Sequence, residues 1–72
     1  MTKFFKIPLI NKDDHNDKKL SLVRTDYVNV MYENKKDKIT NILVNNLNLE
    51  DGYSSMTTQY SIKKILKSVI EI

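Results

Sequence analysis

The sequence predicts an α+β fold: a small, mostly antiparallel sheet of three to five strands with one C-terminal helix packed on one face. Two observations indicate this. Short runs between residues 4 and 44 alternate apolar and polar side chains, which is the period-two pattern of strands. The last segment, residues 61–72, instead spaces its apolar residues as one stripe of a helix. A chain of 72 residues is the size of one domain, so we expect a single domain spanning 1–72.

The N-terminal half predicts two strands joined by a long polar loop. Residues 4–10 form the first strand, and Pro8 places it at a sheet edge or beside an irregularity, because proline has no N–H to donate. Residues 11–19 are wholly polar and predict a solvated loop. Apolar alternation resumes at residues 20–23, which we interpret as the second strand.

The next segments predict a hairpin and a short final strand. Residues 27–33 alternate clearly, residues 34–38 form a polar turn, and residues 39–44 return as the partner strand. A turn of this length suits a longer hairpin loop rather than a two-residue one. After a second turn at residues 50–55, residues 56–59 read as a short strand leading into the helix.

The helix has a recognisable start. Ser61 is a favourable N-cap, since its hydroxyl can accept a hydrogen bond from an N–H of the first turn. Tyr60 and Ile65 occupy the two positions of a hydrophobic staple. A helix of this length is marginal in isolation and must be held by docking on the sheet.

The apolar faces of these elements predict the core. Its expected members are Phe5, Ile7, Leu9, Leu20, Leu22, Val28, Val30, Ile39, Leu43, Ile62, Ile65, Leu66, Val69 and Ile70.

Composition restricts the class of protein. The net charge is +3, the chain has no cysteine, and Arg24 is the only arginine. No apolar run approaches the roughly 18–20 residues that span a membrane, and the N-terminus lacks a signal-peptide cleavage pattern. We expect a cytoplasmic protein of a bacterial or phage-infected host cell. Small domains without disulfides often gain stability by forming oligomers.

The chain contains few residues that could bind a metal or carry out catalysis. Asp13, Asp14, His15 and Asp17 form the only cluster of metal-ligand types, but position six of a calcium loop starting at Asp13 would be Lys18 instead of glycine. The chain offers no second histidine for a zinc site or an oriented triad. We therefore predict no enzyme activity, no cofactor and no metal.

Two kinds of surface could meet a partner. Lys63, Lys64 and Lys67 lie on the polar face of the predicted helix, where the first two oppose its macrodipole. They could meet an anion such as a phosphate, or form an ordinary solvated face. Exposed strand edges and aromatic side chains are the other possibility, and the named candidates are Phe4, Tyr27 and Tyr53. The alternative is that the strand residues complete a monomeric core.

Residues 24–30 (RTDYVNV) and residues 58–65 (TQYSIKKI), with Asp26 and Ser61 at the matching polar positions, resemble the FlbD/SwrD-like family of small flagellar and phage accessory proteins. The resemblance implies a compact sheet-plus-helix accessory protein without catalysis. It implies no binding residues.

The sequence thus predicts a non-enzymatic protein–protein interaction module that forms a homo-oligomer. It could be a phage or mobile-element accessory protein, acting as a virion component or as an inhibitor of a host protein. The alternative is a nucleic-acid-binding accessory protein that uses the Lys-rich helix face.

Overall fold

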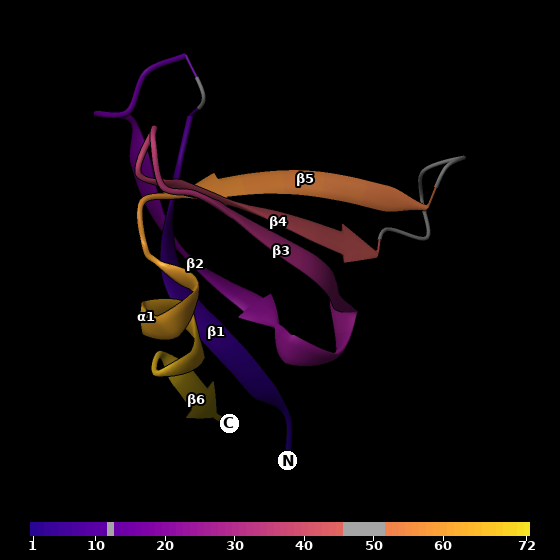
Figure 1. Ribbon diagram of the computed structural model, residues 1–72. Helices are drawn as coiled ribbons and strands as arrows, with labels where there is room; N and C mark the ends of the chain where they lie inside the picture. The colour runs from indigo at the N-terminus through magenta and orange to yellow at the C-terminus, as the bar shows by residue number, and fades with distance from the viewer. Residues whose placement is uncertain (12, 46–51) are drawn as a thin grey trace.

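The computed structural model describes residues 1–11, 13–45 and 52–72, and of Tyr53 it describes the backbone alone. The elements follow in the order β1 (Lys3–Ile10), β2 (Lys18–Arg24), the 3-10 turn η1 (Thr25–Tyr27), β3 (Val28–Asn34), β4 (Ile39–Asn45), β5 (Tyr53–Thr58), α1 (Ile62–Leu66) and β6 (Val69–Glu71). The predicted mostly antiparallel sheet with one helix is confirmed at this level (Figure 1). The predicted strand number was too low, because the described residues form a six-stranded sheet.

The sheet curls into two arms around one core. Its strand order is β2-β1-β5-β4-β3, and β6 pairs with β1 beside this path. The two ends of this order, β2 and β3, are consecutive in the chain and joined by the three residues of η1. In Figure 1, β3, β4 and β5 run together toward one side, whereas β1, β2 and β6 run toward the chain termini. The core lies where the arms meet, as in orthogonally packed sheets.

Strand β1 is central, which corrects the edge position expected from Pro8. It pairs with β2 along its length, with β6 at Lys3–Phe5, and with β5 at Leu9 alone. Pro8 therefore lies between the β6 and β5 pairings, where no strand ladder needs its N–H. Its carbonyl accepts a hydrogen bond from Thr58 Oγ1 at 2.8 Å. The register with β2 is continuous through Pro8, so the gap between the other two pairings is what admits a proline into a central strand.

The C-terminal helix is much shorter than predicted. Helix α1 spans only Ile62–Leu66, and Val69–Glu71 form β6 instead. Ser68 ends the helix: its N–H and its hydroxyl both donate to the carbonyl of Ile65, at 2.9 and 2.6 Å. Val69 and Ile70, whose β-branched side chains favour strands, then pair with β1.

The predicted N-cap is confirmed. Ser61 Oγ accepts a hydrogen bond from the N–H of Lys64 at 3.2 Å. Tyr60 packs against the hydrophobic cluster that contains Ile65, in keeping with the expected staple. Among the described residues, no helix has the length and the apolar character needed to cross a lipid bilayer.

The core is smaller than predicted and uses different faces of two strands. Its buried cluster consists of Phe5, Ile7, Val23, Ile42, Val44 and Ile65. The expected core residues Leu20, Leu22, Leu66 and Val69 are exposed. In β4 the predicted Ile39 and Leu43 are only half-buried, while the opposite face supplies the core.

A bulge explains the mismatch in β3. The pairing register between β3 and β4 shifts between Val28 and Val30. A bulge inserts an extra residue, so the alternation of faces changes along the strand. As a result Val28 and Met31 pack against the core cluster, whereas a strict alternation predicted Val28 and Val30.

Two buried threonines tie the linker before α1 to the sheet. Thr40 Oγ1 donates to the Tyr60 carbonyl at 2.7 Å, and Thr58 Oγ1 accepts from the Tyr60 N–H at 3.2 Å. Both side chains are fully buried, and both hydroxyls are satisfied. These bonds fix the start of α1 beside the turn between β3 and β4.

Candidate functional site

Strand β2 presents an open edge. It stands at the end of the strand order and pairs only with β1 among the described residues. The Lys6 N–H donates to Ser68 on the side away from β2, so Lys6 and its partner Leu22 are not hydrogen-bonded to each other. Hydrogen-bonded and non-hydrogen-bonded pairs alternate in antiparallel strands. The backbone N–H and C=O groups of Leu20 and Leu22 therefore point outward, away from β1.

The same residues also belong to an apolar surface. Leu20 is 62% exposed and Leu22 is 49% exposed. Their partners across the pair are Pro8 and Lys6, so these side chains share the face of the sheet that points away from the core. Phe4, Ile70 and Ile72 follow the same alternation. We call the surface formed by Leu20, Leu22, Phe4, Ile70 and Ile72 the outer face.

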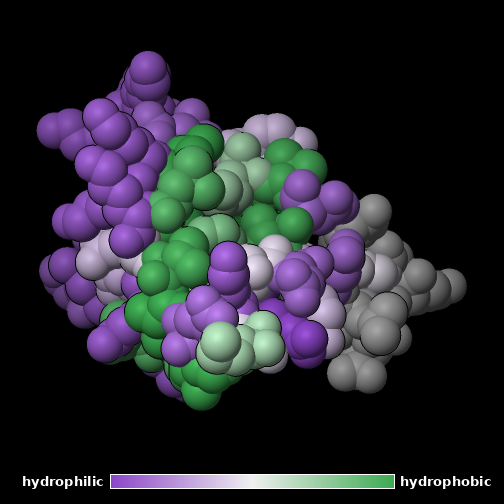
Figure 2. All heavy atoms as spheres, turned by 90° about the horizontal axis from the view of Figure 1, so that it is seen from below, coloured by the Kyte–Doolittle hydropathy of each residue, from purple (hydrophilic) through white to green (hydrophobic). Residues whose placement is uncertain are grey.

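The space-filling view agrees with an apolar surface at this end of the molecule. Figure 2 shows hydrophobic residues gathered in a band, seen from the end where Figure 1 places both termini. Hydrophilic residues border the band on one side. Scattered single apolar residues are ordinary on protein surfaces, but a contiguous apolar patch is typical of an interaction site.

The corner between β2 and β3 is held by Arg24. Its Nη1 donates to the Tyr27 hydroxyl at 3.1 Å, and its guanidinium lies over the Tyr27 ring, 4.9 Å from the centroid. Arg24 Nε lies 3.6 Å from Asp26 Oδ2, which is an ion pair but too long for a hydrogen bond. Tyr27 thus holds the Arg24 side chain at the corner, although Tyr27 itself is 45% exposed.

A second surface forms where the β3–β4 turn meets α1. The Ile62 N–H donates to Glu33 Oε1 at 2.9 Å, which joins the end of β3 to the first residue of the helix. This contact joins two segments that each carry exposed lysines. We call them the hairpin–helix face, and its members are Lys35, Lys36 and Lys38 from the turn and Lys63, Lys64 and Lys67 from the helix and its C-cap.

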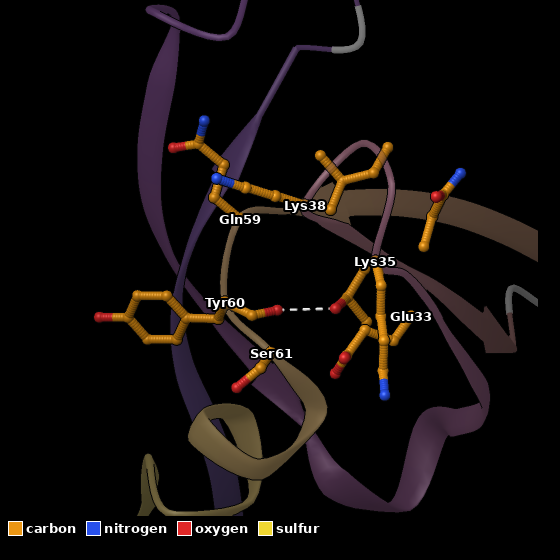
Figure 3. Close-up of a pocket in the computed structure, with 9 residues that line it drawn as sticks. Glu33, Lys35, Lys38, Gln59, Tyr60 and Ser61 are labelled. Carbon is orange, nitrogen blue, oxygen red and sulfur yellow. Dashed lines mark hydrogen bonds between the residues drawn. The ribbon is translucent and has the colours of Figure 1, made fainter.

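A cavity of about 220 Å³ lies at this junction. Its lining consists of Glu33, Asn34, Lys35, Lys38, Ile39, Thr40, Gln59, Tyr60 and Ser61. Figure 3 shows the Lys38 side chain extending toward Gln59, while the Tyr60 carbonyl points inward to Thr40 and the Tyr60 ring points away. The volume is below the roughly 300–1,000 Å³ of pockets for drug-sized ligands, so it suits a small group.

The turn itself is rigidly built. Asn34 Oδ1 accepts from the N–H groups of Lys36 and Asp37, at 3.1 and 3.2 Å, and Asn34 Nδ2 donates to Asp37. Lys38 adopts a left-handed conformation with φ of 56°, which a four-residue hairpin loop of this kind uses to return to the strand. The turn therefore holds its lysines at a fixed place beside the helix.

Lys64 has a further contact. Its ammonium group lies over the Tyr60 ring, 4.3 Å from the centroid. Tyr60 also packs against the core cluster and is only partly exposed. Tyr60 therefore orients a lysine and is not free to stack on another molecule.

The acidic loop before β2 is organised by local turns. Asn11 Oδ1 accepts from the Asp13 N–H at 2.9 Å, and Asp14 Oδ1 accepts from the Asn16 N–H at 3.0 Å. Side chains used this way define turns. Within residues 1–11, 13–45 and 52–72, no three His, Asp or Glu side chains converge as a metal site would require.

The predicted partner-binding residues fall on different parts of the molecule. Phe4 lies on the outer face, and Tyr27 lies at the β2–β3 corner. Lys63 and Lys64 lie in α1, whereas Lys67, also expected in the helix, is its C-cap residue. The side chain of Tyr53 lies outside the described part of the structure.

Some candidate residues were missed by the sequence analysis. The turn lysines are 24 or more positions from the helix, and no local pattern indicates that the turn lies beside it. Leu20 and Leu22 were assigned to the core, because strand alternation does not say which face is buried.

Comparisons of the chain with protein-family models, with curated proteins and with solved structures each found no match. The resemblance to FlbD/SwrD-like proteins therefore stays a prediction from sequence. The function has to be argued from the two surfaces described above.

Proposed function

We propose that this protein is a non-enzymatic protein–protein interaction module that forms a homodimer through strand β2. The observation that carries the proposal is the exposure of Leu20 and Leu22 on a strand whose outward N–H and C=O groups have no partner on any described strand. Unpaired edges with apolar side chains are templates for the addition of another strand.

A second copy of the chain fits this edge because the apolar pattern is symmetric. Leu20-Ser21-Leu22 reads the same in both directions. In an antiparallel β2–β2′ pair centred on Ser21, each Leu20 faces Leu22 of the partner subunit, so four leucines form one cluster. Such a two-fold contact closes on itself and leaves no further β2 edge for growth.

Size supports the same conclusion. A domain of about 60–70 residues buries only about 60% of the surface that its unfolded chain exposes. The chain contains no cysteine to supply a disulfide. Pairing β2 with a second copy would bury apolar surface that a single copy exposes, and this is a common source of stability in small domains.

The pairing carries an electrostatic cost. Centred on Ser21, it brings Lys18 opposite Arg24 of the partner subunit. Asp26 lies 3.6 Å from Arg24 Nε and offsets part of this repulsion. The dimer is consequently expected to be weak to moderate rather than obligate.

Sedimentation equilibrium over a range of concentrations tests the proposal. The natural protein is expected to show a monomer–dimer equilibrium. Leu20→Thr and Leu22→Thr keep β-propensity but remove apolar area, and each change occurs twice in the dimer. We expect each to raise the dissociation constant about tenfold or more, since burying a leucine contributes about 1.5–3 kcal/mol.

Leu66→Gln is the matched control. Leu66 is 56% exposed, between the values for Leu20 and Leu22, but it lies on α1 and not on β2. This variant is expected to dimerise normally. A natural protein that remains monomeric at millimolar concentration, or a Leu66→Gln variant that dissociates as strongly as Leu20→Thr, would contradict the proposal.

Roles as a virion component or as an inhibitor of a host protein both suit a small interaction module. They stay predictions from the sequence. A dimer would present two copies of every other surface of the chain, including the hairpin–helix face.

A further inference from the structure

The positive charge of the chain is concentrated on the hairpin–helix face. Its six lysines, together with the two carboxylates Glu33 and Asp37 that lie among them, give a local charge of +4. The whole chain carries +3, so the remaining residues carry −1. The described lysines of this face are all exposed.

Two of the turn lysines line the cavity, and the helix lysines follow Ser61, which lines it on the helix side. Lys35 and Lys38 belong to its lining, with Ser61 on the helix side, and the hydrogen bond from Ile62 to Glu33 holds the two sides together. The amide of Gln59 is a further donor at the rim (Figure 3). The volume of about 220 Å³ has room for a small anionic group such as a phosphate between these donors.

The chemistry of the face favours a nucleic acid over other partners. Lysine is depleted in protein–protein interfaces, whereas surfaces that contact phosphates are built from lysine and arginine. Helix α1 has five residues and is too short to lie in a membrane interface as an amphipathic helix. A backbone with one phosphate per nucleotide offers evenly spaced charges to the lysines of the turn and to those of the helix and its C-cap.

We propose that the hairpin–helix face binds the phosphate backbone of a nucleic acid. The contacts come from lysine point charges, and this face contains no arginine to read guanine by a bidentate pair. Binding is therefore independent of base sequence. This surface is separate from strand β2, so the proposal does not rest on the dimer.

Glu33 gives the proposal a distinctive signature. Its carboxylate accepts from the Ile62 N–H and at the same time adds negative charge to the cavity. Glu33→Gln keeps an oxygen acceptor for Ile62 and removes the charge. Binding of a polyanion is expected to tighten several-fold in this variant.

Fluorescence anisotropy tests the proposal with a labelled oligodeoxythymidylate of about 20 nucleotides and a duplex of similar length, between about 50 and 200 mM salt. The hairpin variant replaces Lys35, Lys36 and Lys38 with Gln, and the helix variant replaces Lys63, Lys64 and Lys67 with Gln. Each is expected to reduce the slope of log K against log salt by about 2 for single strands, because each lost phosphate contact contributes about 0.7.

The control replaces Lys3, Lys18 and Lys19 with Gln. It lowers the net charge by the same three units, but its lysines belong to β1 and β2 and are not members of the hairpin–helix face. It is expected to keep the slope of the natural protein. Sedimentation of the same variants separates any effect on the dimer from the effect on nucleic acid.

Three results would overturn the proposal. One is that neither probe binds at about 50 mM salt, where phosphate contacts are strong. Another is that the control triple variant weakens binding as much as the hairpin variant. The third is that polyglutamate of equal length competes as well as the oligonucleotide, which would make the face a general polyanion or acidic-protein surface.

Discussion

The β2 edge and the hairpin–helix face differ in what they offer a partner. The β2 edge presents apolar side chains and unpaired backbone groups, so its affinity would come from area removed from water and from strand hydrogen bonds. The hairpin–helix face presents exposed lysines, two of which line a small cavity, so its affinity would come from charge. One short chain thus keeps a surface suited to a protein apart from a surface suited to a polyanion.

The two surfaces also depend on the scaffold in different ways. The β2 edge is built by a continuous ladder of seven residue pairs with β1. The hairpin–helix face is held by single contacts, chiefly Thr40 to Tyr60 and Ile62 to Glu33. Substitutions can therefore damage one surface and spare the other.

The largest effect on stability is expected at Ile65, the residue of α1 that is fully buried in the core cluster. Ile65→Ala should lower the free energy of unfolding by about 2–5 kcal/mol, because it removes apolar contacts and leaves a cavity. Urea titration followed by circular dichroism measures this. Since the core serves both arms, a loss restricted to α1 with an unchanged unfolding midpoint would contradict the shared core.

The Thr40→Val variant tests whether the β2 edge and the hairpin–helix face depend on different contacts. It keeps the shape of a fully buried side chain but removes the hydroxyl that donates to Tyr60. The unpaired carbonyl should cost about 1–3 kcal/mol of stability. Nucleic-acid binding should weaken while dimerisation of the folded protein is unchanged, as checked by anisotropy and sedimentation under conditions where the variant is folded. Equal damage to both activities would mean that the surfaces are not independent.

Lys38→Gly is expected to stabilise the protein. Lys38 has a left-handed conformation, which glycine adopts without the steric cost that a β-carbon imposes. We expect the free energy of unfolding to rise by about 0.5–1 kcal/mol in urea titration. Lys36→Gly in the same turn is the control, since no positive φ is found there, and it should not stabilise.

Salt should act on the two surfaces in opposite directions. Raising salt screens the repulsion between Lys18 and Arg24 of the partner subunit, so the dimer should tighten about two- to threefold, within the range of exposed ion pairs. Over the same range nucleic-acid binding should weaken steeply. Sedimentation and anisotropy on one protein sample measure both, and parallel trends would contradict the separation of the surfaces.

Local features of the fold could be predicted from the sequence, and pairing partners could not. The Ser61 cap and the turn after Asn34 depend on residues within three or four positions, and both are confirmed. The length of the helix depended on the free edge of β1, more than 60 positions away, and the prediction was wrong. The faces of β2 and β4 were also wrong, because both faces carry apolar residues and burial is decided by the other strands.

For the candidate surfaces too, residues close in sequence could be predicted, and groups that meet only in the fold could not. Lys63, Lys64 and Lys67 were found because they lie together in sequence. Lys35 and Lys38 join them only through the contact between Ile62 and Glu33, 29 positions apart. Leu20 and Leu22 became a candidate surface once the described strands left them uncovered.

Disulfide cross-linking tests the β2–β2′ pair most directly, because the natural chain contains no cysteine. In a β2–β2′ pair centred on Ser21, a Ser21→Cys variant places two thiols opposite each other, at a spacing that a disulfide can bridge. Mild oxidation of this variant should give a covalent dimer at micromolar concentration. Ser55→Cys, exposed on the interior strand β5, should stay monomeric under the same conditions. Equal cross-linking of the two variants, or none of Ser21→Cys, would contradict the account.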